Sequence, residues 1–255
     1  MNLSLIDIVD RFTMVIWPML RISAFLAFTS MFSIRAVNFR IRISLSFALA
    51  LFVTLQMPFP RIDPVTGDGL QEIARQILIG FSMGLVFQVA SDALVLAGQN
   101  ISNSMGLSMA NMIDPNMGSV PVISQFINLL GILVFLGLGG HLIVFGLLLE
   151  SFRLLPIGKP FFSQDMLGAI LNWSAMMFLG GLLIGLPVIM ILLFINIGLG
   201  FVSRAAPTLN IFTLGFPALI LGGFLVLMIS MGNDVARIQW VWTQSFMVLQ
   251  KLIGG

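Results

Sequence analysis

The stretch that decides the fold class is "WSAMMFLGGLLIGLPVIMILLFINIGLGFV" (residues 173–202), which contains no charged side chain. A helix crosses the hydrocarbon core of a bilayer with about 20 consecutive apolar residues, so this run is long enough to span a membrane. Transmembrane strands would instead read as short segments of alternating polarity. The stretch therefore predicts a membrane-type helix, with a kink at Pro187.

Five more apolar runs lie outside this stretch, at about residues 12–34, 43–59, 77–97, 126–149 and 214–231. Across the whole chain 58% of residues are hydrophobic and 9% are charged, whereas a soluble domain carries roughly a quarter charged residues. We therefore expect an all-α membrane-type protein with about six hydrophobic helical segments.

Polar segments separate these runs. Connectors at 60–76 and 150–165 carry turn residues and charges of both signs, and a longer polar stretch covers roughly 98–125. After residue 233, apolar side chains recur on one helical face: Val235, Ile238, Trp242, Leu249 and Ile253. This spacing predicts an amphipathic C-terminal helix that packs against a partner or a membrane interface.

The basic residues give no clear membrane orientation. If all six runs crossed the membrane, seven basic residues would lie on one side of it and four on the other. The seven are Arg11, Arg61, Arg75, Arg153, Lys159, Arg237 and Lys251, and the four are Arg35, Arg40, Arg42 and Arg204. The densest cluster then falls on the side with the smaller total, against the usual positive-inside bias. Either the topology is weakly specified, or the runs do not form six simple spans.

Composition and motifs argue against several function classes. The chain has no Cys and one His, which excludes disulfides, thiolate chemistry and a multi-histidine metal centre within it. No HExxH, GxSxG or phosphate-binding glycine loop is present. A net charge of +2 provides no dense basic patch for nucleic acid. We predict a protein that is not an enzyme and needs no cofactor or metal.

Three polar residues interrupt the apolar runs. A bare cation such as Arg21 costs about 3 kcal/mol at the centre of a membrane helix, so it should face protein or water. Asp92 is the obvious carboxylate partner, and a direct transport role for both is the alternative. For His141, a hydrogen bond to a neighbouring helix is favoured over a proton relay, because its run offers no second titratable group.

Glycines four residues apart predict close helix packing. The pairs Gly80 with Gly84 and Gly181 with Gly185 have the spacing that lets two helix backbones approach in lipid.

The stretch "GLSMANMIDPNMGS" (residues 106–119) differs from its apolar surroundings. Its Gly, Ser and Asn residues disfavour a lipid-facing helix, while Met105, Met109, Met112 and Met117 supply soft, adaptable apolar surface. Asp114, followed by Pro, is typical of a turn. Together these features describe a deformable gate or plug in a conduit, and an ordinary surface loop is the alternative that stays open.

Three stretches carry a resemblance to a known family: "GLSMANMIDPNMGSVPVISQF", "GGHLIVFGLLLESFRLLPIG" and "SRAAPTLNIFTLGFPALILGG". They resemble the FliR/SctT family of the flagellar and injectisome type III export apparatus, and the length and hydropathy match over the whole chain. The third stretch is the most specific. Thr208 departs from the pattern, because the family usually has Gln there.

The resemblance implies a fold and a set of partners. Residues 1–165 would be a FliP-like helical region, and residues 166–255 a FliQ-like helical hairpin. The chain would assemble with FliP and FliQ, and with FlhB, into a helical hetero-oligomeric export gate for unfolded protein substrates. Its location would be the bacterial inner membrane at the flagellar basal body, since "NIFTLGFP" leans flagellar.

The resemblance also implies residue roles. The plug loop would cover about residues 103–119, with Met105, Gly106, Met109, Asn111, Met112, Asp114, Pro115 and Met117. The hairpin turn would contact neighbouring subunits through Arg204, Pro207, Asn210, Phe212, Gly215 and Pro217.

Two other functions compete with this one. A small-solute secondary transporter would use Arg21, Asp92 and His141, and would predict inverted repeats with interrupted helices, of which we see no convincing pair. A permease subunit driven by an ATPase would need a cytoplasmic coupling loop, and we identify none.

Overall fold

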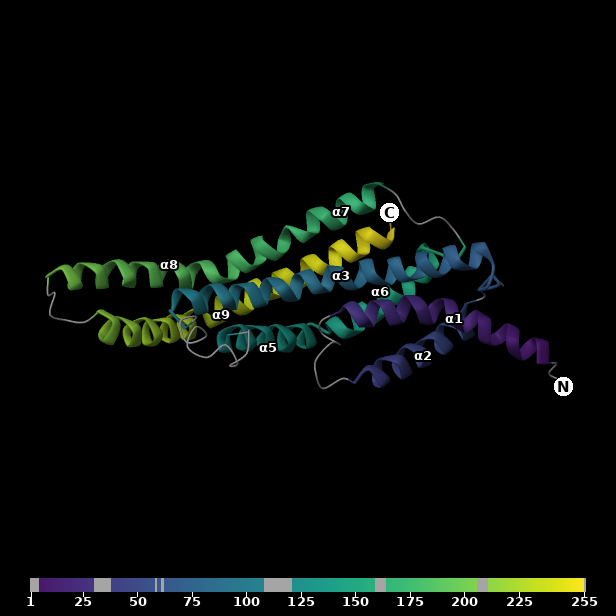
Figure 1. Ribbon diagram of the computed structural model, residues 1–255, viewed down its shortest axis with the longest axis horizontal. Coiled ribbons are helices and arrows are strands. Elements are labelled where there is room, and N and C mark those ends of the chain that lie inside the picture. Colours follow the sequence, from purple (N-terminus) through teal and green to yellow (C-terminus); the bar gives the residue numbers. More distant parts are fainter. Residues whose placement is uncertain are drawn as a thin grey trace. The chain divides into compact units, whose positions relative to one another are not determined.

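All regular elements in the described part of the chain are α-helices. The structure, a computed structural model, describes residues 5–29, 38–57, 59–60, 62–107, 121–158, 164–205 and 211–254. At residues 5–12, 39, 164–167 and 211–214 it describes the backbone and not the side chains. The helices are α1 (Leu5–Phe28), α2 (Phe39–Gln56), α3 (Gly67–Ser104), α5 (Val122–Gly137), α6 (Gly140–Leu154), α7 (Gln164–Ser174), α8 (Met176–Ala205) and α9 (Ile211–Gly254) (Figure 1). The predicted all-α class is confirmed.

The apolar runs do not become six long spans. Within the described residues, three helices are long and apolar enough to cross a membrane: Gly67–Ser104, Gly168–Ala205 and Gly215–Gly254. A fourth span is possible if α5 and α6, which are bent by 68° relative to each other, count as one. The apolar part of α1, Thr13–Phe28, is shorter. The long helices fit an all-α membrane protein.

Local chemistry explains where the helices depart from the predicted runs. α3 begins at Gly67, inside the connector predicted at 60–76. Thr66 acts as its N-cap, because its Oγ1 accepts a hydrogen bond from the backbone N–H of Gly69 (3.2 Å). The apolar run at 126–149 is divided at Gly139, whose φ of +67° ends one helix before the next begins. Pro187 lies inside α8, which continues to Ala205.

The predicted C-terminal amphipathic segment is the second half of α9. Its apolar face is covered by this chain itself rather than by a partner, because Ile238, Trp242, Leu249 and Ile253 are all buried within the chain. The expectation of an uncovered face for a partner or a membrane interface was therefore wrong for these side chains.

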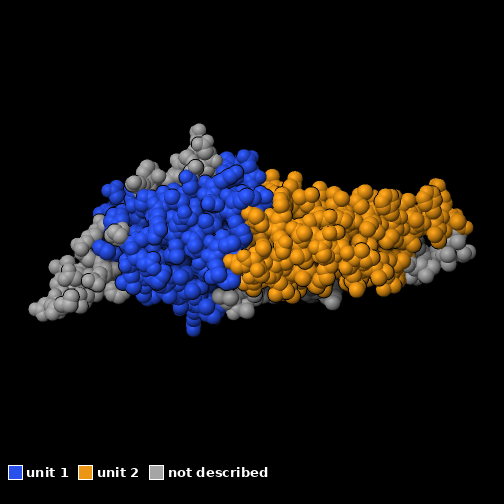
Figure 2. Space-filling model, turned by 180° about the vertical axis from the view of Figure 1, so that it is seen from behind, with its two compact units in different colours: residues 1–89, 140–174, 244–255 blue, residues 90–139, 175–243 orange. Residues whose placement is uncertain are grey.

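The chain forms two compact units, each assembled from separate segments of sequence (Figure 2). Unit 1 comprises residues 1–89, 140–174 and 244–255, and unit 2 comprises residues 90–139 and 175–243. These units are defined by internal packing. The division at residue 165 concerns resemblance to two other proteins, and it stays a prediction.

In unit 1, α1 packs closely on the first half of α3. The backbone carbonyl of Arg21 lies against Gly80 and that of Phe25 against Gly84, so that a Cβ at either glycine would collide with α1. The rings of Phe25 and Phe87 meet edge to face, with centroids 6.2 Å apart. The packing role predicted for this glycine pair is confirmed.

In unit 2, α8 and α9 lie side by side as a hairpin (Figure 1), with Ile195 next to Gly222. Gly181 and Gly185 face the backbone carbonyls of Ala93 and Ala97 in α3, which confirms the second predicted pair. Also in unit 2, the indole N–H of Trp242 donates to the carbonyl of Gly131 in α5 (3.0 Å).

Candidate functional site

The structure describes the two ends of the predicted plug loop. Residues 108–120 lie outside the described part, and they include Met109, Asn111, Met112, Asp114, Pro115 and Met117. Met105 and Gly106 are described at the entry to the loop, and Pro121 at its exit.

The entry is fixed by the end of α3. The backbone N–H of Leu107 donates to the carbonyl of Ser102, and that of Gly106 to the carbonyl of Asn103 (both 3.0 Å). Gly106 has a φ of +79°. This pair of hydrogen bonds with a left-handed glycine is the Schellman motif, which ends a helix and turns the chain away from its axis.

The same entry is seated on α9. Met105 is fully buried, and its side chain occupies the space beside Gly223, where an added Cβ would lie 2.6 Å from the Cε and Cγ atoms of Met105. The ring of Phe216 lies against Gly106. A flexible thioether that fills the gap over a glycine is typical of methionine packing.

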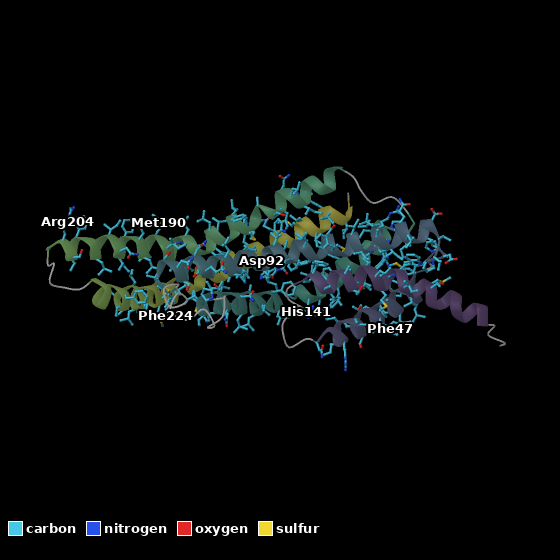
Figure 3. The ribbon with its side chains drawn as sticks, in the orientation of Figure 1. Phe47, Asp92, His141, Met190, Arg204 and Phe224 are labelled. Carbon is cyan, nitrogen blue, oxygen red and sulfur yellow. The ribbon has the colours of Figure 1, made fainter. Side chains whose placement is uncertain are left out.

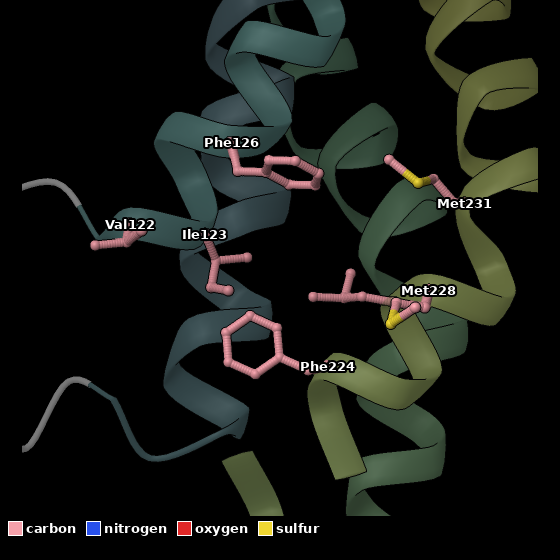
Figure 4. Close-up of a pocket in the computed structure, with 7 residues that line it drawn as sticks. Val122, Ile123, Phe126, Phe224, Met228 and Met231 are labelled. Atoms are coloured by element: carbon pink, nitrogen blue, oxygen red, sulfur yellow. The ribbon is translucent and has the colours of Figure 1, made fainter. Parts of the chain in front are cut away.

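The exit of the loop lies against α3 and close to α9. α5 begins at Val122, and Ser124 in its first turn is pressed against Gly98 of α3 with no room for a Cβ between them. An apolar pocket of about 310 Å³ opens beside this start (Figure 4). Its lining comes from α5 (Val122, Ile123 and Phe126) and from α9 (Phe224, Leu227, Met228 and Met231). The entry of the loop is therefore anchored on α9 and its exit on α3, with an apolar pocket between the exit and α9.

The predicted subunit-contact residues lie at the far end of the hairpin. Arg204 is exposed in the last turn of α8, which Figure 3 shows near the end of that helix. Gly215 is buried and Pro217 exposed near the start of α9. Pro207 and Asn210 lie outside the described residues, and Phe212 belongs to α9 without a description of its side chain.

Arg21 is buried in unit 1, and its guanidinium is held by protein groups. Its Nε donates to Oε1 of Gln76 (2.7 Å), its Nη1 to the carbonyl and hydroxyl oxygens of Ser151 (2.9 and 3.2 Å), and its Nη2 to the carbonyl of Leu155 (2.8 Å). The ring of Phe152 lies below it, 4.2 Å from the guanidinium carbon to the centroid. Arg21 thus caps the C-terminal end of α6.

The carboxylate near Arg21 is Glu72, which sequence reasoning missed. Glu72 is 1% exposed. Its Oε1 accepts hydrogen bonds from Nε2 of Gln76 (2.6 Å) and from the backbone N–H of Gly158 (3.1 Å), and its Oε2 from Nη1 of Arg75 (2.6 Å). Gln76 therefore bridges Arg21 and Glu72. The spacing of Glu72 and Gln76, one helical turn apart, was the available signal.

The other two predicted polar residues do not join this cluster. Asp92 is not among the groups bonded to Arg21; it lies in the α3 segment of unit 2, whereas Arg21 lies in unit 1. His141 is the second residue of α6. Its Nδ1 is buried, and no described group forms the expected hydrogen bond with that atom.

The described residues also contain no group of three or more His, Asp or Glu side chains that could hold a metal ion.

Comparison with known proteins places the chain in a family. The model of the bacterial export proteins, family 1, matches residues 12–245. The flagellar biosynthetic protein FliR of Pectobacterium carotovorum subsp. carotovorum is 37% identical over 223 residues, which cover 87% of this chain and 85% of the relative.

Two further relatives are similar. FliR of Escherichia coli (strain K12) is 31% identical over 238 residues, 93% of this chain and 91% of the relative. The Yop proteins translocation protein T of Yersinia pestis is 26% identical over 180 residues, 67% of each chain. The chain therefore belongs to the bacterial export proteins of family 1, the FliR and SctT family, and is a membrane component of the flagellar or type III export apparatus.

Proposed function

We propose that this chain is a non-catalytic subunit of the flagellar type III export gate. With FliP and FliQ, and with FlhB joining them, it forms the channel entrance for unfolded export substrates in the bacterial inner membrane. The similarity to two flagellar FliR proteins over most of the chain supports the flagellar assignment. Energy comes from other components and the proton gradient, so the chain needs no cofactor of its own.

The length of the apolar helices supports assembly with other subunits. The candidate spans Gly67–Ser104 and Gly215–Gly254 have 38 and 40 residues. At 1.5 Å per residue they are about 57 and 60 Å long, roughly twice the hydrocarbon core of a bilayer. Large apolar side chains along α8 and α9 are nonetheless exposed in the isolated chain. Lipid alone cannot cover so long a surface, and neighbouring protein subunits can.

The hairpin of α8 and α9 is the part that we assign to subunit contact. We retain residues 1–165 as the FliP-like region and residues 166–255 as the FliQ-like hairpin. Arg204 is the described cation at the end of this hairpin, and no described carboxylate pairs with it. A partner subunit that supplies an acceptor would complete this end, together with Pro207, Asn210, Phe212, Gly215 and Pro217.

The methionine-rich loop is the proposed plug, and the observation that carries this proposal is the seating of its entry on α9. Met105 fills the space over Gly223, and Gly106 faces Phe216. The exit begins beside an apolar pocket on the same helix. A loop whose entry is held by α9 and whose exit is held by α3, with soft methionine side chains between, can close a passage and yield when a substrate arrives.

Deletion of residues 109–117 tests the plug. The deletion leaves both anchors in place, so we expect normal assembly with FliP and FliQ and an increased leak of small ions across the membrane of cells that express the complex. Replacing Met109, Met112 and Met117 by Leu is the matched control, because it keeps apolar volume and should keep the seal. Unchanged ion leakage from a normally assembled deletion variant would refute the plug.

A further inference from the structure

We infer that α2 is a lipid-contacting helix: its outer face lies against the acyl chains of the bilayer, and Arg40 at its start lies at the level of phospholipid phosphates. This assignment goes beyond the proposed export function, because it identifies which of the exposed apolar surfaces of this chain meets lipid rather than protein.

The exposed apolar surface of α2 covers more than half of the helix circumference. Among the described side chains of α2, only Ser46, Ala50 and Val53 are buried, and they lie on one stripe of a helix that packs against α1. The exposed large apolar side chains are Ile41, Ile43, Leu45, Phe47, Leu51, Phe52 and Leu55 (Phe47 is labelled on α2 in Figure 3). With 3.6 residues per turn they spread over about 200° of the helix circumference.

The polar side chains of α2 are arranged as lipid requires. The hydroxyl of Ser44, which is exposed, donates to the carbonyl of Arg40 (3.0 Å), and that of Thr54 donates to the carbonyl of Ala50 (2.7 Å). The buried Ser46 hydroxyl donates to the carbonyl of Arg42 (2.6 Å). No water is available in the bilayer core, so hydroxyl groups that bond within their own helix suit a lipid-facing position.

The buried stripe has the composition of a membrane helix contact. Ser46 and Ala50 are small and lie one turn apart on the side toward α1. Lipid gives apolar helices no hydrophobic drive to associate, so close approach across small residues supplies the packing.

Length distinguishes α2 from the long helices α8 and α9, and basic residues at one end distinguish it from the short helix α5. Its 18 residues give a length of about 27 Å, which matches a hydrocarbon core of about 30 Å. Arg40 and Arg42 lie in its first turns, and the helix contains no acidic residue. Cations near a helix N-terminus interact unfavourably with the helix dipole, so these two arginines do not stabilise α2. A phosphate at the membrane surface complements the exposed Arg40.

The test uses single cysteines in the full chain, expressed in membranes together with the export-apparatus proteins of its own host. The chain has no native Cys, so each introduced cysteine is the only thiol of this chain, and the cysteine-free parent chain in the same membranes gives the background labelling. Leu55→Cys reports on the outer face of α2 and Ser44→Cys on its first half. Val65→Cys, 88% exposed in the loop before α3, is the water-exposed control. We expect bromine-labelled phospholipids to quench both α2 positions while aqueous iodide quenches only position 65.

Two results would overturn the inference. Protection of the α2 labels from both quenchers would mean that a protein subunit covers the helix, and quenching by iodide would mean that water does. Ser44→Cys is nearly isosteric and keeps the test valid if Leu55→Cys does not fold. A label at Met190→Cys on α8 separately reports on the proposed subunit cover, and there we expect no quenching by lipid.

The role of Arg40 is tested by lipid charge. At position 44 we expect brominated phosphatidylglycerol to be enriched over brominated phosphatidylcholine, and Arg40→Gln to lower this preference about fivefold, the effect typical of one arginine at an anionic surface. An unchanged preference in Arg40→Gln would overturn the assignment of the phosphate to Arg40.

Discussion

The helices inside unit 1 and the helices inside unit 2 are held by different kinds of contact. In unit 1, α1, α3 and the end of α6 meet around a buried polar cluster in which Gln76 bridges Arg21 and Glu72, and both charged groups also bond to the backbone. In unit 2, helices meet across glycines, as at Gly98 and Gly181, and Met105 fills the space beside Gly223. Close glycine contacts also occur in unit 1, at Gly80 and Gly84, so what sets unit 1 apart is the directional bonding of its buried polar cluster.

This difference has a physical consequence. A buried cluster of charged groups tolerates one geometry, because any displaced donor or acceptor is left without a partner in a low dielectric. Contacts between glycine backbones and methionine side chains lose less when a helix shifts by a small distance. Unit 1 is therefore suited to act as a fixed frame. Unit 2, which carries both ends of the methionine-rich loop, is suited to small rearrangements.

The largest effect is expected from Arg21→Ala. The substitution leaves Oε1 of Gln76 and the carbonyls of Ser151 and Leu155 without their donor, whereas Glu72 keeps its ion pair with Arg75. The unpaired buried acceptors and the lost side-chain volume together should cost about 3–5 kcal/mol in the free energy of unfolding. The free energy of unfolding is measured by adding a denaturing detergent stepwise to the protein purified in a mild detergent. Arg153→Ala is the control, since Arg153 is exposed on α6 and should change stability by less than about 0.5 kcal/mol. A loss below 1 kcal/mol for Arg21→Ala would contradict the idea of a directional frame.

A smaller effect is expected from Gly98→Ala in unit 2. The new Cβ would collide with the backbone of Ser124, so α3 and α5 must separate at a cost of about 1–3 kcal/mol. Gly146→Ala in α6 is the matched control, because open space surrounds that position and alanine favours a helix by up to about 1 kcal/mol. The same unfolding titration should give opposite signs for the two variants. Stabilisation by both would show that the close contact at Gly98 is not required.

The smallest effect on folding is expected from Arg204→Ala, which sharpens the contrast between a buried and an exposed arginine. We expect at most about 1 kcal/mol of lost stability, from the favourable position of a cation at a helix C-terminus. Co-purification with FliP and FliQ should fall roughly tenfold, as for an interface arginine worth about 1.4 kcal/mol.

Arg237→Ala serves as its control, because Arg237 already pairs with Asp234 in the same helix (3.1 Å). Full recovery of both partners with Arg204→Ala would remove this residue from the interface.

The sequence was informative where the signal was local. Hydropathy alone predicted the all-α membrane class, and the four-residue spacing of Gly80 with Gly84 and of Gly181 with Gly185 predicted the close helix contacts. Both properties depend on residues that are neighbours along one helix, so no knowledge of the partner helix was needed.

The sequence was less informative where the partner is distant. Glu72 lies 51 positions from Arg21 and in a segment that hydropathy assigned to a connector, so Asp92, in an apolar run, seemed the better candidate. The break at Gly139 was not predicted, because apolar residues lie on both sides of it and only the backbone conformation ends the helix. For the second half of α9, the apolar face was predicted, but not that the chain itself covers it.

The most direct test of the central claim is the mass of the native complex. The chain would be co-expressed with FliP and FliQ from its own host, purified in mild detergent and weighed by native mass spectrometry. We predict a stable hetero-oligomer that contains all three proteins. A monomer or homodimer of this chain, with neither partner retained, would contradict its role as an export-gate subunit.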